Sequence, residues 1–195
     1  MGFSAIVLAA GAGERFGGGK LTARFRGEAL LAHAIRVARA APVESVFVVH
    51  TPELPMGVWN GQPDVVALKL SSSGLAQSLK AGVAAAGHAD GVFVFLGDMP
   101  LVPHEIAGCL APLLKNNFAV VPRHAGKPGH PVLLSRRAFP EIEGLAGDEG
   151  AGRLLRERTD VAFLDCADDR VLLDVDRIED LARLEERIRA QGEAE

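Results

Sequence analysis

The chain has few cysteines, no excess of basic residues and no long hydrophobic run, and each absence excludes a class of protein. Only two cysteines, Cys109 and Cys166, occur in 195 residues, far apart and without a CxxC motif or a histidine-rich neighbourhood. A disulfide framework needs more cysteines, and neither cysteine has the neighbours that a zinc site would use. We therefore expect two reduced thiols in the core.

The net charge of −4 argues against general binding to nucleic acid or to an anionic membrane, because both need a basic face. The first apolar run has no basic leader and is too short for a signal peptide or a membrane span, which predicts a cytoplasmic protein. Apolar residues make up 48% of the chain and charged residues 24%, an ordinary globular balance. The length suits one domain over residues 1–195.

Strands and helices are predicted to alternate along the chain. Apolar runs predict strands at 3–9, 45–50, 65–70, 91–96, 118–121, 132–134, 161–166 and 171–175. Helical periodicity predicts helices at 28–41, 75–86, 104–114 and 136–142, one ending at 157, and one at 177–190, whereas 51–63 is predicted to be a loop. This pattern predicts a doubly wound, mostly parallel sheet in a three-layer α/β/α Rossmann-like fold, with ligands at the carboxyl edge of the strands.

The segment AIVLAAGAGERFGGGK, residues 5–20, is a buried strand followed by a glycine-rich loop. A Walker A loop is excluded, because it needs glycine at Glu14 and Ser or Thr at Leu21. A dinucleotide fingerprint fits poorly, because it needs glycine at Phe16. Two readings remain: a loop whose backbone N–H groups bind an anion with Arg15 and Lys20, or a flexible turn with solvated cations.

The segment LAAGAGERFGGGK resembles the LAAGxSxRxGxxK signature of nucleotidyltransferases with the nucleotide-diphospho-sugar transferase fold. Within them it resembles the MobA-like NTP transferase family and its molybdenum cofactor cytidylyltransferase branch. Further matching segments follow in the expected order across nearly the whole chain: GLAQSLKAG (74–82), GDMP (97–100), GHPVLL (129–134), GDEGAG (147–152) and DVDRIEDL (174–181). The resemblance implies a nucleotide-binding half at 1–122 and an acceptor-binding half at 123–195.

The resemblance also implies roles for residues on the donor side. Arg15 and Lys20 would hold the triphosphate, and Asp98 and Asp176 would bind Mg²⁺. The nucleotide would lie against Leu8, Ala9, Ala10, Gly11 and Gly13.

The residues alone leave other roles open for the two aspartates. Asp98 is also suited to form a turn, and Asp176 to cap the last helix. Asp174 and Asp176 alternate along a predicted strand, so only one of them is expected to join Asp98.

Other residues are candidates with two readings each. Ser73, Gly74 and Ser78 contact the nucleotide or cap a helix, and His130 approaches the acceptor or is an ordinary loop histidine. Asp148 and Gly150 are candidates for an anion or pterin contact on the acceptor side. The chain departs from the family where Gly152 replaces the usual arginine, with Arg153 one place later.

The expected function is transfer of CMP from CTP to the terminal phosphate of molybdenum-bound molybdopterin, giving the cytosine dinucleotide and pyrophosphate. Related guanylyltransferases usually carry glycine where this chain has Ala10, which favours cytidine. The expected partners are the nucleotide, the molybdopterin-type acceptor, and a molybdoenzyme or its chaperone. The alternatives are a guanylyltransferase, an NTP transferase with another phosphate acceptor, and a non-catalytic carrier of the molybdenum cofactor.

Overall fold

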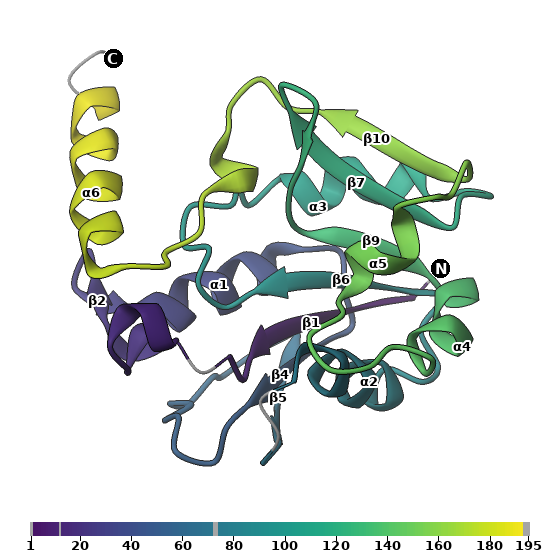
Figure 1. Ribbon diagram of the computed structural model, residues 1–195, viewed down its shortest axis with the longest axis horizontal. Helices are drawn as coiled ribbons and strands as arrows, with labels where there is room; N and C mark the ends of the chain where they lie inside the picture. The colour runs from purple at the N-terminus through teal and green to yellow at the C-terminus, as the bar shows by residue number, and fades with distance from the viewer. Residues whose placement is uncertain (1, 12, 72–73, 193–195) are drawn as a thin grey trace.

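The computed structural model describes residues 2–11, 13–71 and 74–192, and a central sheet dominates it (Figure 1). The strands of this sheet are β1 (Phe3–Ala9), β4 (Ser45–His50), β5 (Asp64–Lys69), β6 (Gly91–Leu96), β7 (Ala119–His124), β8 (Lys127–Pro128), β9 (Val132–Ser135) and β10 (Val161–Asp165). Their order is β10-β7-β9-β6-β1-β4-β5, and β8 pairs with β7. A separate hairpin joins β2 (Arg24–Phe25) to β3 (Glu28–Ala29).

Most of the long strands run in one direction. β1 lies parallel to β4 and β6, β4 to β5, and β7 to β10. Only β9 among the long strands is antiparallel to its neighbours, β6 and β7. The turns after β1 and β6 therefore meet at one edge of the sheet, together with the residues that precede β9. The predicted mostly parallel sheet is confirmed.

Helices cover both faces of the sheet (Figure 1). One face packs against α1 (Leu30–Ala40) and α3 (Ile106–Leu110), and the other against α2 (Leu75–Ala85), α4 (Phe139–Ile142) and α5 (Ala151–Leu155). Each large aliphatic side chain that is fully buried in these layers stabilises the fold by about 1.5–3 kcal/mol. The three-layer arrangement follows directly from the predicted alternation of strands and helices.

The last helix, α6 (Ile178–Gly192), stands beside the hairpin rather than over the sheet (Figure 1). A third apolar cluster joins them, with Phe25 and Leu30 from the hairpin side and Val175 and Leu184 from the end of the chain. The final part of the chain is thereby anchored next to the loop that follows β1.

The predicted strand at 171–175 is wrong. The chain forms the 3₁₀ helix η5 (Arg170–Leu172) and then an extended segment outside the sheet. The reason is that this segment crosses the strand ends: the carbonyl of Val171 accepts from the backbone N–H of His130 at 2.8 Å. A Cβ on Gly129 would lie 2.3 Å from the same carbonyl oxygen, so this crossing requires glycine there.

Smaller differences concern the ends of helices and the thiols. Two predicted helices each split into a 3₁₀ and an α segment, η3 (Ala111–Leu113) after α3 and η4 (Arg136–Ala138) before α4. Both cysteines are free, but Cys109 is exposed, because Ile106, Ala107 and Leu110 occupy the core face of α3. The prediction of a core thiol is therefore wrong for Cys109. Among the described residues, no helix is both long and apolar enough to cross a membrane.

Candidate active site

The loop after β1 carries two cations to the carboxyl edge of the sheet. Arg15 lies within the 3₁₀ turn η1 (Glu14–Phe16), and Lys20 begins η2 (Lys20–Thr22). Gly19, which precedes η2, has φ +64°, a left-handed backbone conformation that residues other than glycine rarely adopt. The run of glycines therefore fixes the direction in which Lys20 leaves the loop.

Lys20 connects the two aspartates that the sequence proposed as metal ligands. Its Nζ lies 2.6 Å from Oδ2 of Asp98 and 3.4 Å from Oδ1 of Asp176. The guanidinium of Arg15 reaches Oδ2 of Asp176 at 3.0 Å. The structure thus brings together four residues that are far apart in the sequence.

Charge and burial act against each other at this cluster. Burial works to lower the pKa of Lys20, but the hydrogen bond and charge of Asp98, with a further contribution from Asp176, raise it above its ordinary value. Burial likewise works to raise the pKa of Asp176, but Lys20 and Arg15 lower it overall. The Lys20 ammonium and the Asp176 carboxylate therefore remain charged around neutral pH.

Asp176 reaches the cluster because the end of the chain binds the turn after β6. The backbone N–H of Val175, a fully buried residue, donates to the carbonyl of Asp98 at 3.0 Å. The carboxylate of Asp180 accepts from the backbone N–H groups of Asp176 and Arg177 at 3.0 and 2.7 Å. Asp180, in the first turn of α6, thus holds the two residues that precede the helix, and the side chain of Asp176 reaches Lys20.

Asp174 lies near the same cluster, but within the described residues Lys20 and Arg15 form their ion pairs with Asp98 and Asp176 instead. Partial desolvation, followed by the charges of Asp98 and Asp176, raises the pKa of Asp174. The predicted alternation of Asp174 and Asp176 on a strand does not apply, because this segment is not a strand.

A cavity of about 680 Å³ opens beside the charged cluster. It is lined by Leu8, Ala10, Gly11, Gly13, Arg15, Lys20, Leu21, Leu75, Ser78, Leu96, Asp98, Asp148 and Asp176. Most of the residues proposed from the sequence are among them. The leucines at positions 21, 75 and 96 were not anticipated, since apolar residues at strand and helix ends carry no local signal of a site.

Some proposed residues do not line the first cavity. Ala9 is buried and lines a smaller cavity of about 270 Å³ against the same loop. Ser73 lies outside the described residues. Ser78 does line the first cavity, but it is only 3% exposed, and its hydroxyl donates to the carbonyl of Gly74 at 3.2 Å, within the first turn of α2.

The GDEGAG segment packs against the start of α2. The carbonyl of Gly147 accepts from the backbone N–H of Ala76 at 3.1 Å. A Cβ on Gly150 would lie 2.7 Å from the side chain of Leu75, and one on Gly74 3.1 Å from the Gly147 carbonyl. This close packing places the exposed Asp148 at the rim of the first cavity.

A second cavity, of about 510 Å³, adjoins the first, and Leu8, Leu75 and Leu96 line both. His130 lines this second cavity instead of the first. Arg153 does not line it, and its guanidinium pairs with Glu149 at 3.5 Å. The cation at this cavity is Arg156, which the sequence analysis missed because it stands outside every recognised motif.

Comparisons with known proteins assign the chain to a family. The sequence model described as a MobA-like NTP transferase domain matches residues 5–162. The chain is 30% identical over 189 residues to purine catabolism protein PucB of Bacillus subtilis, covering 90% of this chain and 92% of that protein. It is 35% identical over 103 residues to a probable molybdenum cofactor guanylyltransferase of Thermococcus sibiricus, covering 50% and 48%.

Among solved structures, Rv0371c of Mycobacterium tuberculosis in complex with manganese superposes with a TM-score of 0.76 at 28% identity. The match covers 95% of this chain and 99% of that one. The similarities in sequence and in fold agree with each other. The chain therefore belongs to the MobA-like NTP transferase family and is a nucleotidyltransferase.

Proposed function

We propose that this enzyme transfers CMP from CTP to the terminal phosphate of molybdenum-bound molybdopterin. The observation that carries the proposal is the convergence of Arg15 and Lys20 with Asp98 and Asp176 beside one large cavity. Two cations suit a triphosphate, and two carboxylates suit a divalent metal. A non-catalytic carrier of the finished cofactor has no need of both.

In the proposed reaction an oxygen of the acceptor phosphate forms a bond to the α-phosphorus of CTP. The bond from that phosphorus to the oxygen bridging to the β-phosphate breaks, and pyrophosphate leaves with the electron pair. The acceptor phosphate is already an anion, so no side chain has to remove a proton. Lys20 and Arg15 stabilise the negative charge on the transferred and departing phosphates.

Asp98 and Asp176 fit a divalent cation such as Mg²⁺. Both supply hard carboxylate oxygens, and Oδ1 of Asp98 is buried without a hydrogen-bond partner among the described residues. Within the described ranges no group of three or more His, Cys, Asp or Glu side chains is suited to a metal, so phosphate oxygens would complete the ligand set. A bound metal supplies charge neutralisation at the phosphates.

The choice of CTP rests on Ala10, which is buried and lines the first cavity where the family's guanylyltransferases usually have glycine. Its methyl group takes space beside the base. GTP is the second candidate donor, because one relative is named a probable molybdenum cofactor guanylyltransferase.

The test is a turnover assay with molybdenum-bound molybdopterin, Mg²⁺ and each of CTP, GTP, ATP and UTP. Pyrophosphate release is followed, and the dinucleotide product is identified by mass. We expect the highest kcat/KM with CTP, and the Ala10→Gly variant should shift the CTP to GTP preference toward GTP by about tenfold. A wild-type preference for GTP would overturn the choice of CTP, and pyrophosphate release with none of the four would favour the carrier.

A further inference from the structure

The second cavity has a chemistry that phosphate transfer does not require. Its walls are mostly aliphatic and come from the face of the sheet that α2 and α5 cover. Phe163 of β10 stands at this cavity with 48% of its surface exposed, and the guanidinium carbon of Arg123 lies 4.9 Å from the centre of its ring. An apolar hollow with an exposed aromatic ring favours a flat, largely apolar occupant.

Arg156 gives this cavity one uncommitted positive charge. The arginines on either side are engaged: Arg153 pairs with Glu149 at 3.5 Å, and Arg158 bonds Asp160 and Glu141. No hydrogen bond or ion pair holds the Arg156 side chain within the part of the chain that the structure describes. An unpaired guanidinium beside an apolar cavity is suited to a negatively charged or carbonyl oxygen of a ligand.

Gly152 leaves space next to this guanidinium. It lines the same cavity one helical turn before Arg156, and a Cβ built on it meets no heavy atom within 4 Å. The neighbouring polar group is His130, whose Nδ1 donates to the carbonyl of Val94 at 3.3 Å. In the neutral ring its Nε2 is then an acceptor.

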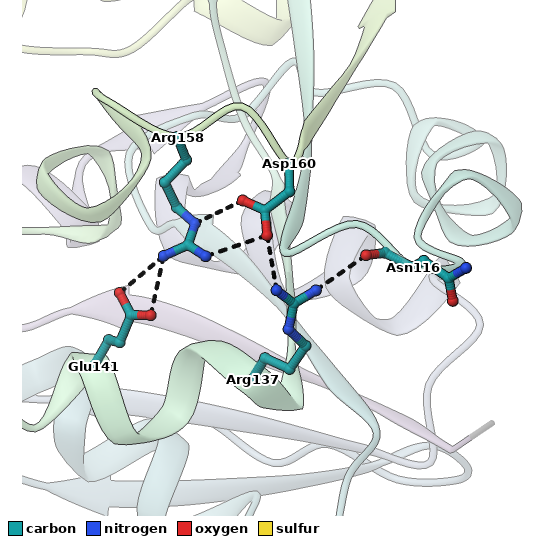
Figure 2. Close-up of polar contacts among 5 residues, drawn as sticks. All are labelled: Asn116, Arg137, Glu141, Arg158 and Asp160. Atoms are coloured by element: carbon teal, nitrogen blue, oxygen red, sulfur yellow. Dashed lines mark hydrogen bonds and ion pairs between the residues drawn. The ribbon is translucent and has the colours of Figure 1, made fainter.

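The wall that carries Arg156 is held by a polar network (Figure 2). Arg158 donates to Oδ1 of Asp160 at 2.8 Å and to Oε1 of Glu141 at 3.0 Å, and Arg137 reaches Asp160 at 2.8 Å. The guanidinium of Arg158 also lies 3.5 Å from the centre of the Phe118 ring. This network joins the residues after α5 to α4 and to the start of β7, so the cavity has a fixed wall.

We propose that the second cavity binds the body of the acceptor, a flat ring system, and that Arg156 contacts an anionic or carbonyl oxygen remote from the reacting phosphate. The inference rests on the proposed function for the position of that phosphate, near Asp98 in the adjoining first cavity. Arg156 is then a specificity-determining residue for the acceptor and has no role toward CTP.

The first test separates acceptor from donor kinetics. In Arg156→Met we expect the KM for molybdenum-bound molybdopterin to rise about tenfold or more while the KM for CTP changes less than about twofold. Arg156→Lys should recover part of the loss. The matched control is Arg153→Met, which removes a paired arginine three residues earlier in the chain and should change neither KM. Gly152→Leu fills the open space and should raise the acceptor KM in the same way.

The second test measures binding without turnover, with 8-anilinonaphthalene-1-sulfonate as a flat apolar probe that carries one anion. We expect saturable fluorescence that molybdenum-bound molybdopterin displaces and CTP does not, with an affinity about tenfold lower in Arg156→Met and Gly152→Leu but not in Arg153→Met. Thermal unfolding of each variant checks that it is folded.

The two proposals fail in different ways. A wild-type protein that forms no pyrophosphate with any donor overturns the proposed function. A wild-type protein that turns over while both cavity variants keep its acceptor KM overturns the assignment of this cavity, as does probe binding that is insensitive to Arg156→Met and Gly152→Leu.

Discussion

The two adjoining cavities differ in how their charges are used. In the first, Lys20, Arg15, Asp98 and Asp176 are tied to one another by short contacts. In the second, the walls are mostly apolar, and the side chain of Arg156 forms no hydrogen bond or ion pair within the described ranges. The difference fits the two proposed roles, in which the first cavity binds the phosphates and the second binds the rest of the acceptor.

The largest effect is expected from Asp98→Asn. The amide keeps the shape of the side chain but lacks the negative charge that the Asp98 carboxylate presents to Lys20 and to a metal. We therefore expect kcat to fall by about 10³-fold or more. Steady-state pyrophosphate release measures this loss, and circular dichroism on heating checks the fold. The control is Asp64→Asn, an exposed residue of β5. Substantial turnover in Asp98→Asn would remove Asp98 from the chemistry.

Lys20→Met should change two quantities in opposite directions. Turnover should fall by about 10²-fold, because a charge on the phosphates is lost. Mn²⁺ binding without nucleotide should tighten by about tenfold, because the Lys20 ammonium contacts both carboxylates and competes with a cation. Electron paramagnetic resonance of free Mn²⁺ measures the affinity, with the exposed Lys127→Met as control. Weaker Mn²⁺ binding in Lys20→Met would contradict the competition.

Arg158→Met should act on the second cavity through its wall. Loss of the contacts in Figure 2 should lower the midpoint of thermal unfolding by about 2–4 °C. The acceptor KM should rise by about threefold, since the wall carrying Arg156 loosens, while the KM for CTP stays unchanged. Differential scanning calorimetry and the turnover assay measure the two effects. A raised KM for CTP would show that the two cavities are not independent.

The smallest effect concerns His130 in the second cavity. Burial lowers its pKa, and the hydrogen bond to Val94 and the charge of Asp98 oppose this only in part. Below the ordinary histidine pKa of about 6.5, the His130 ring is protonated in the unfolded chain but stays neutral in the folded chain. The free energy of unfolding therefore falls as the pH is lowered.

The slope that His130 contributes is at most about 1.4 kcal/mol per pH unit. His130→Asn retains a donor for the carbonyl of Val94 and should flatten the curve between about pH 6.5 and 5.5. Urea unfolding at a series of pH values tests this. An identical pH dependence in both proteins would mean that His130 is not held neutral.

The charged cluster beside the first cavity could be predicted from the sequence largely because its signals are local. A strand that ends in a glycine run positions Arg15 and Lys20, and a buried strand that ends in GDMP positions Asp98. In each case the residues that set the backbone are neighbours of the residue that they place. Parallel strands then bring these turns to one edge without any further information.

The rest depends on contacts between distant segments. Asp176 reaches Lys20 because Val175 binds the backbone of Asp98, whereas an isolated apolar run at 171–175 predicts a strand. The second cavity is built from single residues on several elements, and its cation, Arg156, follows a short helix with no motif around it. Such a site exists only after the sheet and α5 have packed.

The most direct measurement is anomalous diffraction from crystals grown with Mn²⁺ and a non-hydrolysable CTP analogue. We expect a manganese peak bound by the carboxylates of Asp98 and Asp176, with Lys20 and Arg15 on the triphosphate. A manganese peak away from both aspartates, or a triphosphate bound outside the first cavity, would contradict it.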